Sequence, residues 1–335
     1  MKKSFVFVIF IVLCATAFGQ DEIQKAAADA AAAITQAQDK EVAVEKPRYW
    51  ETSSEFNLGF NQTALLNWAA GGYNTLSLAI GIDAKANYAK DLTSWNNRLQ
   101  LDYGFLWSSD KSNLLQKSND RIYLESMFAY KTGANSKWNY TASLDVKTQF
   151  TNSYDNYQQD EETKKWNGTL KSGFFSPAYI NLALGMEWKP VDWFSINLAP
   201  ATGGVTIVSN EILRKTYGLK PISEEDEKYH QALFQFGAQI KANLKVSLND
   251  VFSYETQLVL FTDYFNKPFN YNRINWDNKF NWQATKFFKI GLSTWLIYDP
   301  IVAITDSDGE SRTSLVQFKE FLTLSFTYTI TNKKN

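Results

Sequence analysis

The sequence has few of the residues on which most enzymes and metal sites depend. Among 335 residues there is one cysteine, Cys14, and one histidine, His230. A single cysteine excludes a disulfide framework, and a lone Cys and His cannot form a zinc site of the Cys/His type. A hydrolase with a histidine base would have to use His230, which lies in a stretch that resembles a loop. We therefore expect no enzyme, no catalytic residue, no metal and no cofactor.

Net charge and long apolar runs are also missing. Lys and Arg number 34 against 35 Asp and Glu, and the net charge of -1 gives no basic surface for nucleic acid. No stretch after residue 20 approaches the 18 or so apolar residues of a membrane-spanning helix. If the chain is a membrane protein, it must be a closed β-barrel, because lipid offers no partner for unpaired backbone groups.

The first 49 residues differ from the rest and predict export. Two lysines precede the apolar run Phe5–Leu13, and Ala17–Gly19 is a small-x-small cleavage pattern. We expect residues 1–19 to be a signal peptide. Residues 20–49 are rich in alanine and predict a short helical or disordered periplasmic extension, with a plain linker as the alternative. The barrel is expected at residues 50–332.

From residue 50 on, apolar residues recur at every second position. The segment 76–88 alternates Leu, Leu, Ile, Ile, Ala, Ala and Tyr with Ser, Ala, Gly, Asp, Lys and Asn. Successive side chains of a strand point to opposite faces, so one face is apolar and the other is polar or small. We predict an all-β fold, an antiparallel transmembrane barrel of about 12 strands. Fourteen is the alternative, because Pro200 and Gly203-Gly204 interrupt the seventh strand.

The segments between the predicted strands are alternately long and short. Tight turns at 189–192 and 249–250 follow the long stretches 152–176 and 202–230. Transmembrane barrels have short periplasmic turns and longer external loops. Aromatic side chains beside these segments predict two girdles, one at each lipid interface. The residues that flank the short turns are Tyr88, Tyr130, Trp138, Trp188, Trp282 and Tyr328, and Tyr298 flanks a long loop.

The polar face of the predicted strands carries charges of both signs. The candidate lumen-lining residues are Lys85, Arg98, Asp102, Arg121, Glu125, Asp145, Lys147, Glu255, Asp277 and Lys279. Arg98 with Asp102, and Arg121 with Glu125, lie two inward positions apart on one strand and are expected to pair. Two interpretations stay open: a water-filled channel whose charges tune permeation, and a lumen closed by ion pairs.

Three stretches depart from this pattern. Glu320 falls on the apolar side of the last strand, which indicates either the outer interface or a β-bulge. The loop Thr63–Gly72 is partly apolar and is expected to cap the barrel mouth, with an inward constriction as the alternative. The acidic runs Asp160–Glu162 and Glu224–Glu227 are expected to be solvated loop surface.

The segment Asn67–Gly72, NWAAGG, resembles a recurring signature in a family of outer-membrane barrels of Bacteroidetes-type bacteria. That family is catalogued as a domain of unknown function. Further similar pieces occur in the expected order at 147–150, 176–179, 198–203, 296–299 and 316–320. The resemblance implies an outer-membrane barrel and brings no activity or ligand.

Together these observations predict a protein of the bacterial outer membrane, exported through a cleaved signal peptide. The expected function is a channel or transporter for small solutes. The alternative is a non-conducting structural or assembly component of an outer-membrane protein complex. The expected partners are outer-membrane lipid and lipopolysaccharide, with other envelope proteins as a further alternative.

Overall fold

The computed structural model describes residues 49–63, 74–223, 228–265, 272–305 and 311–332, together with Asp29. The chain divides into two units between Arg48 and Tyr49, and the second unit holds the barrel. The expected signal peptide and nearly all of the extension lie outside the described residues and stay predictions, as do the roles of loop 64–73 and of the acidic run at 224–227. In the described part of the chain, no helix has the length and hydropathy needed to cross a membrane.

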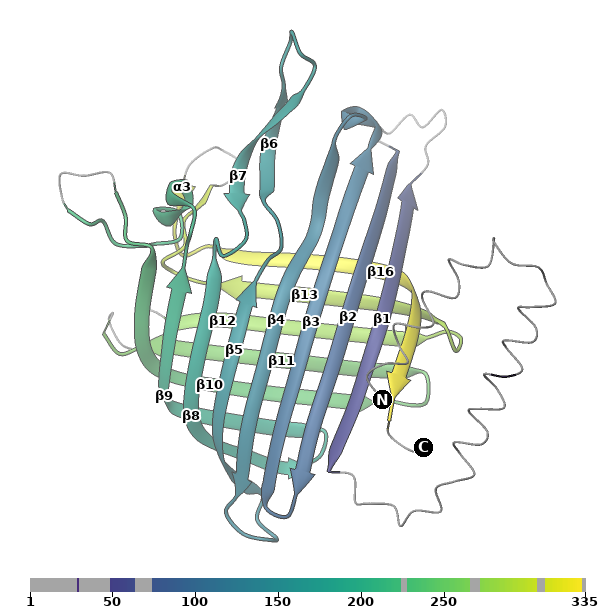
Figure 1. Cartoon of the computed structure of the whole chain (residues 1–335), viewed down its shortest axis with the longest axis vertical. Coiled ribbons are helices and arrows are strands. Elements are labelled where there is room, and N and C mark those ends of the chain that lie inside the picture. The colour runs from purple at the N-terminus through teal and green to yellow at the C-terminus, as the bar shows by residue number, and fades with distance from the viewer. Residues whose placement is uncertain are drawn as a thin grey trace. The chain divides into compact units, whose positions relative to one another are not determined.

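Twelve antiparallel strands close into one barrel (Figure 1). The ring closes because β1 pairs with β2 on one side and with β16 on the other. The predicted fold class and the count of twelve are confirmed. In chain order the barrel strands are β1 (Trp50–Thr63), β2 (Thr75–Lys90), β3 (Thr93–Ser108), β4 (Leu115–Lys131), β5 (Trp138–Thr148), β8 (Ala178–Val191), β9 (Phe194–Ile207), β10 (Ala232–Ser247), β11 (Phe252–Asp263), β12 (Asn272–Gln283), β13 (Phe288–Tyr298) and β16 (Val316–Thr331).

The predicted alternation of long and short connections is confirmed. Short turns join β2 to β3, β4 to β5, β8 to β9, β10 to β11 and β12 to β13. The long connections lie at the other end, and four of them carry structure of their own (Figure 1). These elements are η1 (Ser109–Lys111), the hairpin β6 (Ser153–Gln159) and β7 (Trp166–Ser172), α3 (Glu211–Arg214), and the hairpin β14 (Ile304–Thr305) and β15 (Ser311–Arg312).

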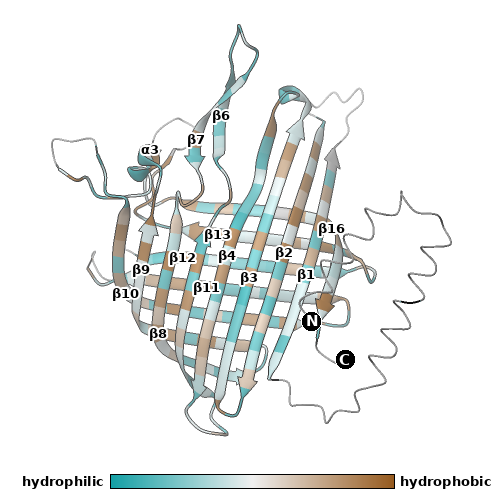
Figure 2. Cartoon of the chain, viewed as in Figure 1, coloured by the Kyte–Doolittle hydropathy of each residue, from teal (hydrophilic) through white to brown (hydrophobic). Residues whose placement is uncertain are grey.

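Burial in the barrel is inverted relative to a soluble domain. In β5 the side chains of Tyr140 and Leu144 are exposed on the outer face, whereas Thr141 and Asp145 are buried inside. The same alternation of apolar and polar residues follows the strands around the wall (Figure 2). Each strand has apolar side chains on its outer face and polar side chains on its inner face, so the lumen is the polar interior of this fold.

The strand around Pro200 is continuous, so the alternative count of fourteen is wrong. β9 runs through Pro200, and its register shifts against both neighbours at this level, beside Gly185 of β8 and Gly237 of β10. A Cβ at Gly185 would overlap the backbone of Leu198, and one at Gly237 would overlap the carbonyl of Thr262. These bulges leave Pro200 without a ladder partner, which suits a residue that has no N–H to donate.

Glu320 is on the outer face, as its parity predicts. It pairs with Thr294, and the register between β13 and β16 is unbroken from Phe288 to Tyr298. The alternative of a bulge at Glu320 is therefore wrong.

Candidate functional site

All ten predicted lumen residues lie on the inner wall. Nine of them line one of two cavities in the lumen, and the tenth, Asp102, reaches Arg121. Charged groups of both signs therefore meet in a confined polar space. The site is built from side chains that the alternating strands direct inward, and its character depends on which charges are paired.

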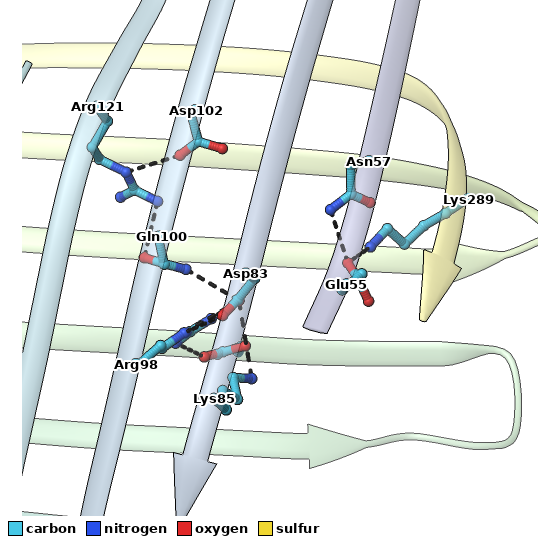
Figure 3. A network of polar contacts seen from close by, with 10 residues as sticks. Glu55, Asn57, Asp83, Lys85, Arg98, Gln100, Asp102, Arg121 and Lys289 are labelled. Carbon is cyan, nitrogen blue, oxygen red and sulfur yellow. Dashed lines mark hydrogen bonds and ion pairs between the residues drawn. The ribbon is translucent and has the colours of Figure 1, made fainter. Parts of the chain in front are cut away.

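Arg98 joins opposite walls of the barrel. Its Nη1 lies 2.6 Å from Oε1 of Glu255, and the two residues come from β3 and β11, which are six places apart in the ring of twelve. Its Nη2 lies 2.5 Å from Oδ2 of Asp83 on the neighbouring strand β2. Gln100 donates to the same Asp83 oxygen at 3.2 Å (Figure 3). The guanidinium is thus held between two carboxylates that come from opposite sides of the lumen.

Lys241 forms a second crossing. Its Nζ lies 2.9 Å from Oδ1 of Asp145 and 3.0 Å from Oε1 of Glu125, so β10 is joined to β5 and β4. The side chain of Lys241 is only 5% exposed. Tyr123 donates its hydroxyl to Asp145 at 3.3 Å, which completes this cluster. A buried ammonium between two carboxylates holds three strands of the wall together.

Arg121 makes a third set of contacts. Its Nε lies 3.0 Å from Asp102, and its Nη2 donates to Gln100 at 3.0 Å (Figure 3). The guanidinium also lies 4.8 Å from the ring centre of Trp295 on β13, and Nζ of Lys319 lies 5.1 Å from the same centre. A cation near the face of an indole ring is attracted by its π electrons. This contact ties β4 to the far side of the barrel.

The predicted pairing along single strands is wrong. Arg98 pairs with Asp83 and Glu255 rather than with Asp102, and Arg121 pairs with Asp102 rather than with Glu125. Residues four apart on a strand are about 13 Å apart, whereas neighbouring strands are only about 4.8 Å apart. Cross-strand partners are therefore much closer than partners on the same strand.

Glu55 and Lys319 are further inward charges that the set of predicted lumen residues lacks. Glu55 forms an ion pair with Lys289, and both residues lie near the junction of the first and last strands (Figure 3). Lys319 donates to Asn119 at 3.2 Å. The signal was present in the sequence, since Phe56 and Phe318 are outward and their neighbours must point inward.

Two cavities occupy the lumen. One, of about 360 Å³, lies toward the short turns and is lined by Lys85, Arg98 and Glu255 among others. The second, of about 820 Å³, lies toward the long loops and is lined by Arg273, Tyr179 and Phe261 among others. The two cavities have four lining residues in common, which are Tyr123, Lys147, Gln257 and Asn275. They therefore adjoin at one level of the lumen.

The long-loop cavity is covered in part by a small apolar core. The core consists of Val208, Leu213, Leu219 and Leu233, and Leu170, Tyr217, Tyr229 and Ile301 pack against it. Tyr217 donates its hydroxyl to the Lys171 carbonyl at 3.1 Å, and burial raises the pKa of Tyr217 to about 12. Burial also raises the pKa of Asp299, which lies after β13 and lines the same cavity. The loops that bear these side chains are thus folded onto one another above the lumen.

Most of the predicted girdle residues lie near the short turns. Trp138 contacts Trp188 with ring centres 6.4 Å apart, and Trp282 stacks on Phe252 at 5.9 Å. Six of the seven predicted residues sit near this end, and most of their rings are exposed: Tyr88, Tyr130, Trp138, Trp188, Trp282 and Tyr328. Tyr298 ends β13 at the opposite end, beside the long loops, as predicted. The role of these residues at a lipid interface stays a prediction.

His230 is exposed in the loop that precedes β10, and its backbone N–H donates to the carbonyl of Lys220. Within the described ranges, no three His, Cys, Asp or Glu side chains come together as a metal-binding group.

Comparison with known proteins gives one family match. A family model described as a protein of unknown function (DUF3078) matches residues 60–154, from the end of β1 to the start of β6. The NWAAGG segment, Asn67–Gly72, lies within this range. The similar pieces from residue 176 onward lie outside it, so the family resemblance there stays a prediction, as does a Bacteroidetes origin. Among curated proteins no relative matches this chain.

Several solved structures are similar in part. An outer membrane channel from Pseudomonas putida F1 shares 11% identity at a TM-score of 0.38, over 87% of this chain and 99% of that one. The Pseudomonas putida toluene transporter TodX shares 8% identity at a TM-score of 0.31, over 85% of this chain and 90% of that one. OmpT, an outer membrane protein of Vibrio cholerae, shares 8% identity at a TM-score of 0.29, over 86% of this chain and 100% of that one.

Proposed function

We propose that this protein is an outer-membrane β-barrel whose lumen admits small solutes. The closed ring leaves no free strand edge, and its outer face is apolar and exposed. Both features suit a wall that faces hydrocarbon. The predicted signal peptide supports export to the outer membrane, where lipid and lipopolysaccharide would surround the wall.

The single observation that carries the solute function is the contact between the two cavities. They begin at opposite ends of the barrel and share a level of lining side chains, Tyr123, Lys147, Gln257 and Asn275. In the described part of the chain, side chains rather than a folded plug separate them. A side-chain barrier of this kind opens by rotamer changes and exchange of ion-pair partners.

A non-conducting role is the second candidate, and the Arg98–Glu255 pair favours it. This contact spans opposite walls of the ring, and Lys241 adds a second tie. Side chains that cross-link a lumen stabilise a barrel without providing a path. The two functions therefore differ in whether these ion pairs open.

Conductance of the purified full-length protein in planar bilayers separates the two functions. We expect small, intermittent currents for the wild type and larger, more persistent currents for Arg98→Ala, because this change removes the side chain that spans the lumen. Lys289→Ala is the matched control. It also breaks an inward ion pair, but one between strands only two places apart in the ring, so its conductance should equal that of the wild type.

A folded wild type and a folded Arg98→Ala variant that both fail to conduct would contradict the solute function. That result, together with co-purification of another envelope protein, would favour the non-conducting role. Heat-dependent mobility in SDS gels would show that each variant keeps its barrel.

A further inference from the structure

A row of polar side chains crosses the outer, apolar face of the barrel. The row runs over four neighbouring strands, with Thr256 on β11, Asn278 on β12, Thr294 on β13 and Glu320 on β16. Each of these residues is the direct cross-strand partner of the next. We call these four residues the polar row. On these four strands the even-numbered side chains, most of them apolar, face outward, and all four residues of the row have even numbers.

Apolar rows border the polar row on both sides. Toward the long loops lie Leu258, Trp276, Leu296 and Phe318, which are also successive partners. Toward the short turns lie Tyr254, Phe280, Leu292 and Leu322. On β13 two outward residues lie beyond Thr294 toward the long loops and three lie beyond it toward the short turns. The polar row therefore lies within the apolar wall, two outward positions from its long-loop end.

Hydrogen bonds satisfy the row at one end. Trp276 Nε1 donates to Thr256 Oγ1 at 2.9 Å, and Thr256 Oγ1 lies 2.8 Å from Asn278 Oδ1. Asn278, which is buried on this outer face, donates through Nδ2 to Thr294 Oγ1 at 3.3 Å. The Thr294 hydroxyl keeps its own proton to donate.

The other end is unsatisfied. Among the described residues, none donates a hydrogen bond to the exposed Glu320 side chain or pairs with its charge. Another outward acidic residue, Asp120, is paired with Lys117 and accepts from backbone N–H groups. Phe318 and Leu322, on either side of Glu320, are 64% and 60% exposed. A carboxylate in this position needs a donor from outside the chain, because lipid offers none.

We propose that the polar row is a dimer interface, and that its occupant is a second copy of this chain. The row is self-complementary, since it has an unsatisfied acceptor at Glu320 and an available donor in the Thr294 hydroxyl. A two-fold axis along the membrane normal that passes beside Thr294 brings the Glu320 carboxylate of each barrel to the Thr294 hydroxyl of the other. Polar contacts of this kind hold membrane-spanning segments together where apolar burial supplies no driving force. The exposed Phe318 and Leu322 then pack across the axis.

The opposite face of the barrel serves as the comparison. Ser126 on β4 is also outward, and β4 is six places from β12 in the ring. Its hydroxyl donates to Asn97 at 2.7 Å and accepts from Trp95 at 2.9 Å. The Ser126 hydroxyl is thus satisfied within the chain and needs no donor or acceptor from a partner.

Cysteine cross-linking in lipid nanodiscs and native membranes tests the proposal. Cys14 is the sole cysteine and lies in the expected signal peptide, so an introduced thiol acts alone. We expect Thr294→Cys to form a disulfide-linked dimer on mild oxidation, whereas Ser126→Cys and the wild type should not. In light scattering, Glu320→Leu should shift the equilibrium about tenfold toward monomer. Its barrel should stay folded, as heat-dependent gel mobility would show.

A wild type that is monomeric in nanodiscs would overturn the proposal. So would a Thr294→Cys variant that cross-links no faster than Ser126→Cys, or one that links to a protein of another mass. The interface rests on the membrane location of the proposed function and is independent of conductance. A barrel that conducts but stays monomeric would retain the proposed function and lose the dimer, and a non-conducting dimer would do the reverse.

Discussion

The interior of the wall and the loops above it are held together by different kinds of contact. Between the strands, Arg98 and Lys241 cross the interior as charged groups held by carboxylates. Above the strands, the long connections fold over one another around Val208, Leu213, Leu219 and Leu233, a core that contains no charge. The same chain thus uses electrostatic contacts inside the wall and apolar packing in its loops.

The difference follows from where each segment can place its side chains. A strand of the wall must direct alternate residues to a polar lumen and to the apolar exterior, so its inner contacts are polar. A loop is free of this alternation and can bury its apolar residues against another loop. Ion pairs exchange partners without unfolding the wall, whereas an apolar core opens only as a unit. We therefore expect the loop cap and the charged crossings to respond to different perturbations.

Removal of the Lys241 charge should have the largest effect. Lys241→Met leaves Asp145 and Glu125 close together in the wall without their common cation. Breaking a buried pair in this way destabilises a protein by about 3–5 kcal/mol, and water in the adjoining cavities favours the lower end. Equilibrium urea unfolding in detergent micelles would measure the loss.

The control for this prediction is an ion pair outside the wall. Lys171 and Asp155 in the β6–β7 hairpin lie 3.1 Å apart, with side chains 37% and 45% exposed. Lys171→Met should change the free energy of unfolding by less than about 1 kcal/mol, because water screens exposed pairs. Equal losses in the two variants would show that the lumen is as well hydrated as the surface.

Leu213→Ala should have a smaller and more local effect. Leu213 is buried in the loop core, and truncation of a buried leucine costs about 2–3 kcal/mol in a small core of this kind. If the cap opens apart from the wall, trypsin cleavage after Arg214, Lys215 or Lys220 should accelerate about 30- to 150-fold. The urea midpoint of the barrel should stay the same.

Ile212→Ala is the matched control, since the neighbouring side chain is 78% exposed and outside the core. Its cleavage rate should remain close to that of the wild type. A lower urea midpoint for Leu213→Ala would mean that loops and wall unfold together, and the distinction between them would be lost.

Most of the fold could be predicted from the sequence. Alternation with period two specifies which face of each strand is apolar, and the spacing of turns gave the strand count and the two ends. Pro200 was harder, because a proline in a strand suggests a break. The bulges that accommodate it depend on Gly185 and Gly237 in neighbouring strands, and a single-strand pattern does not contain that information.

The candidate site could be predicted in part. Parity placed the ten charged residues inside, but it did not identify their partners. Arg98 meets Glu255 only because the ring closes with β3 opposite β11, which is a property of all twelve strands together. Likewise, the polar row became visible only once the register brought Thr256, Asn278 and Thr294 beside Glu320. In each case the decisive neighbour is distant in sequence.

The smallest effect is expected at the tip of the β6–β7 hairpin. Asp160 accepts hydrogen bonds from the backbone N–H groups of Glu162 and Thr163, at 3.1 and 2.7 Å, and from the Thr163 hydroxyl at 2.8 Å. These donors, the Thr163 backbone N–H first, hold the pKa of Asp160 below its usual value of 3.8. Unlike the lumen carboxylates, Asp160 lies in solvent and has only a local role.

The sign of its pH dependence follows from that lowered pKa. A depressed carboxyl pKa contributes stability that is fully present above 3.8 and is lost as the pH falls through the lower value in the folded hairpin. In an NMR titration, the Thr163 amide signal should therefore move with a midpoint below 3.8, and Asp160→Asn should abolish the movement. The urea midpoint of the barrel should be the same for Asp160→Asn and wild type, because nothing in the wall depends on this turn. A midpoint at or above 3.8 would show that these hydrogen bonds do not stabilise the ionised Asp160 carboxylate, and this prediction would be wrong.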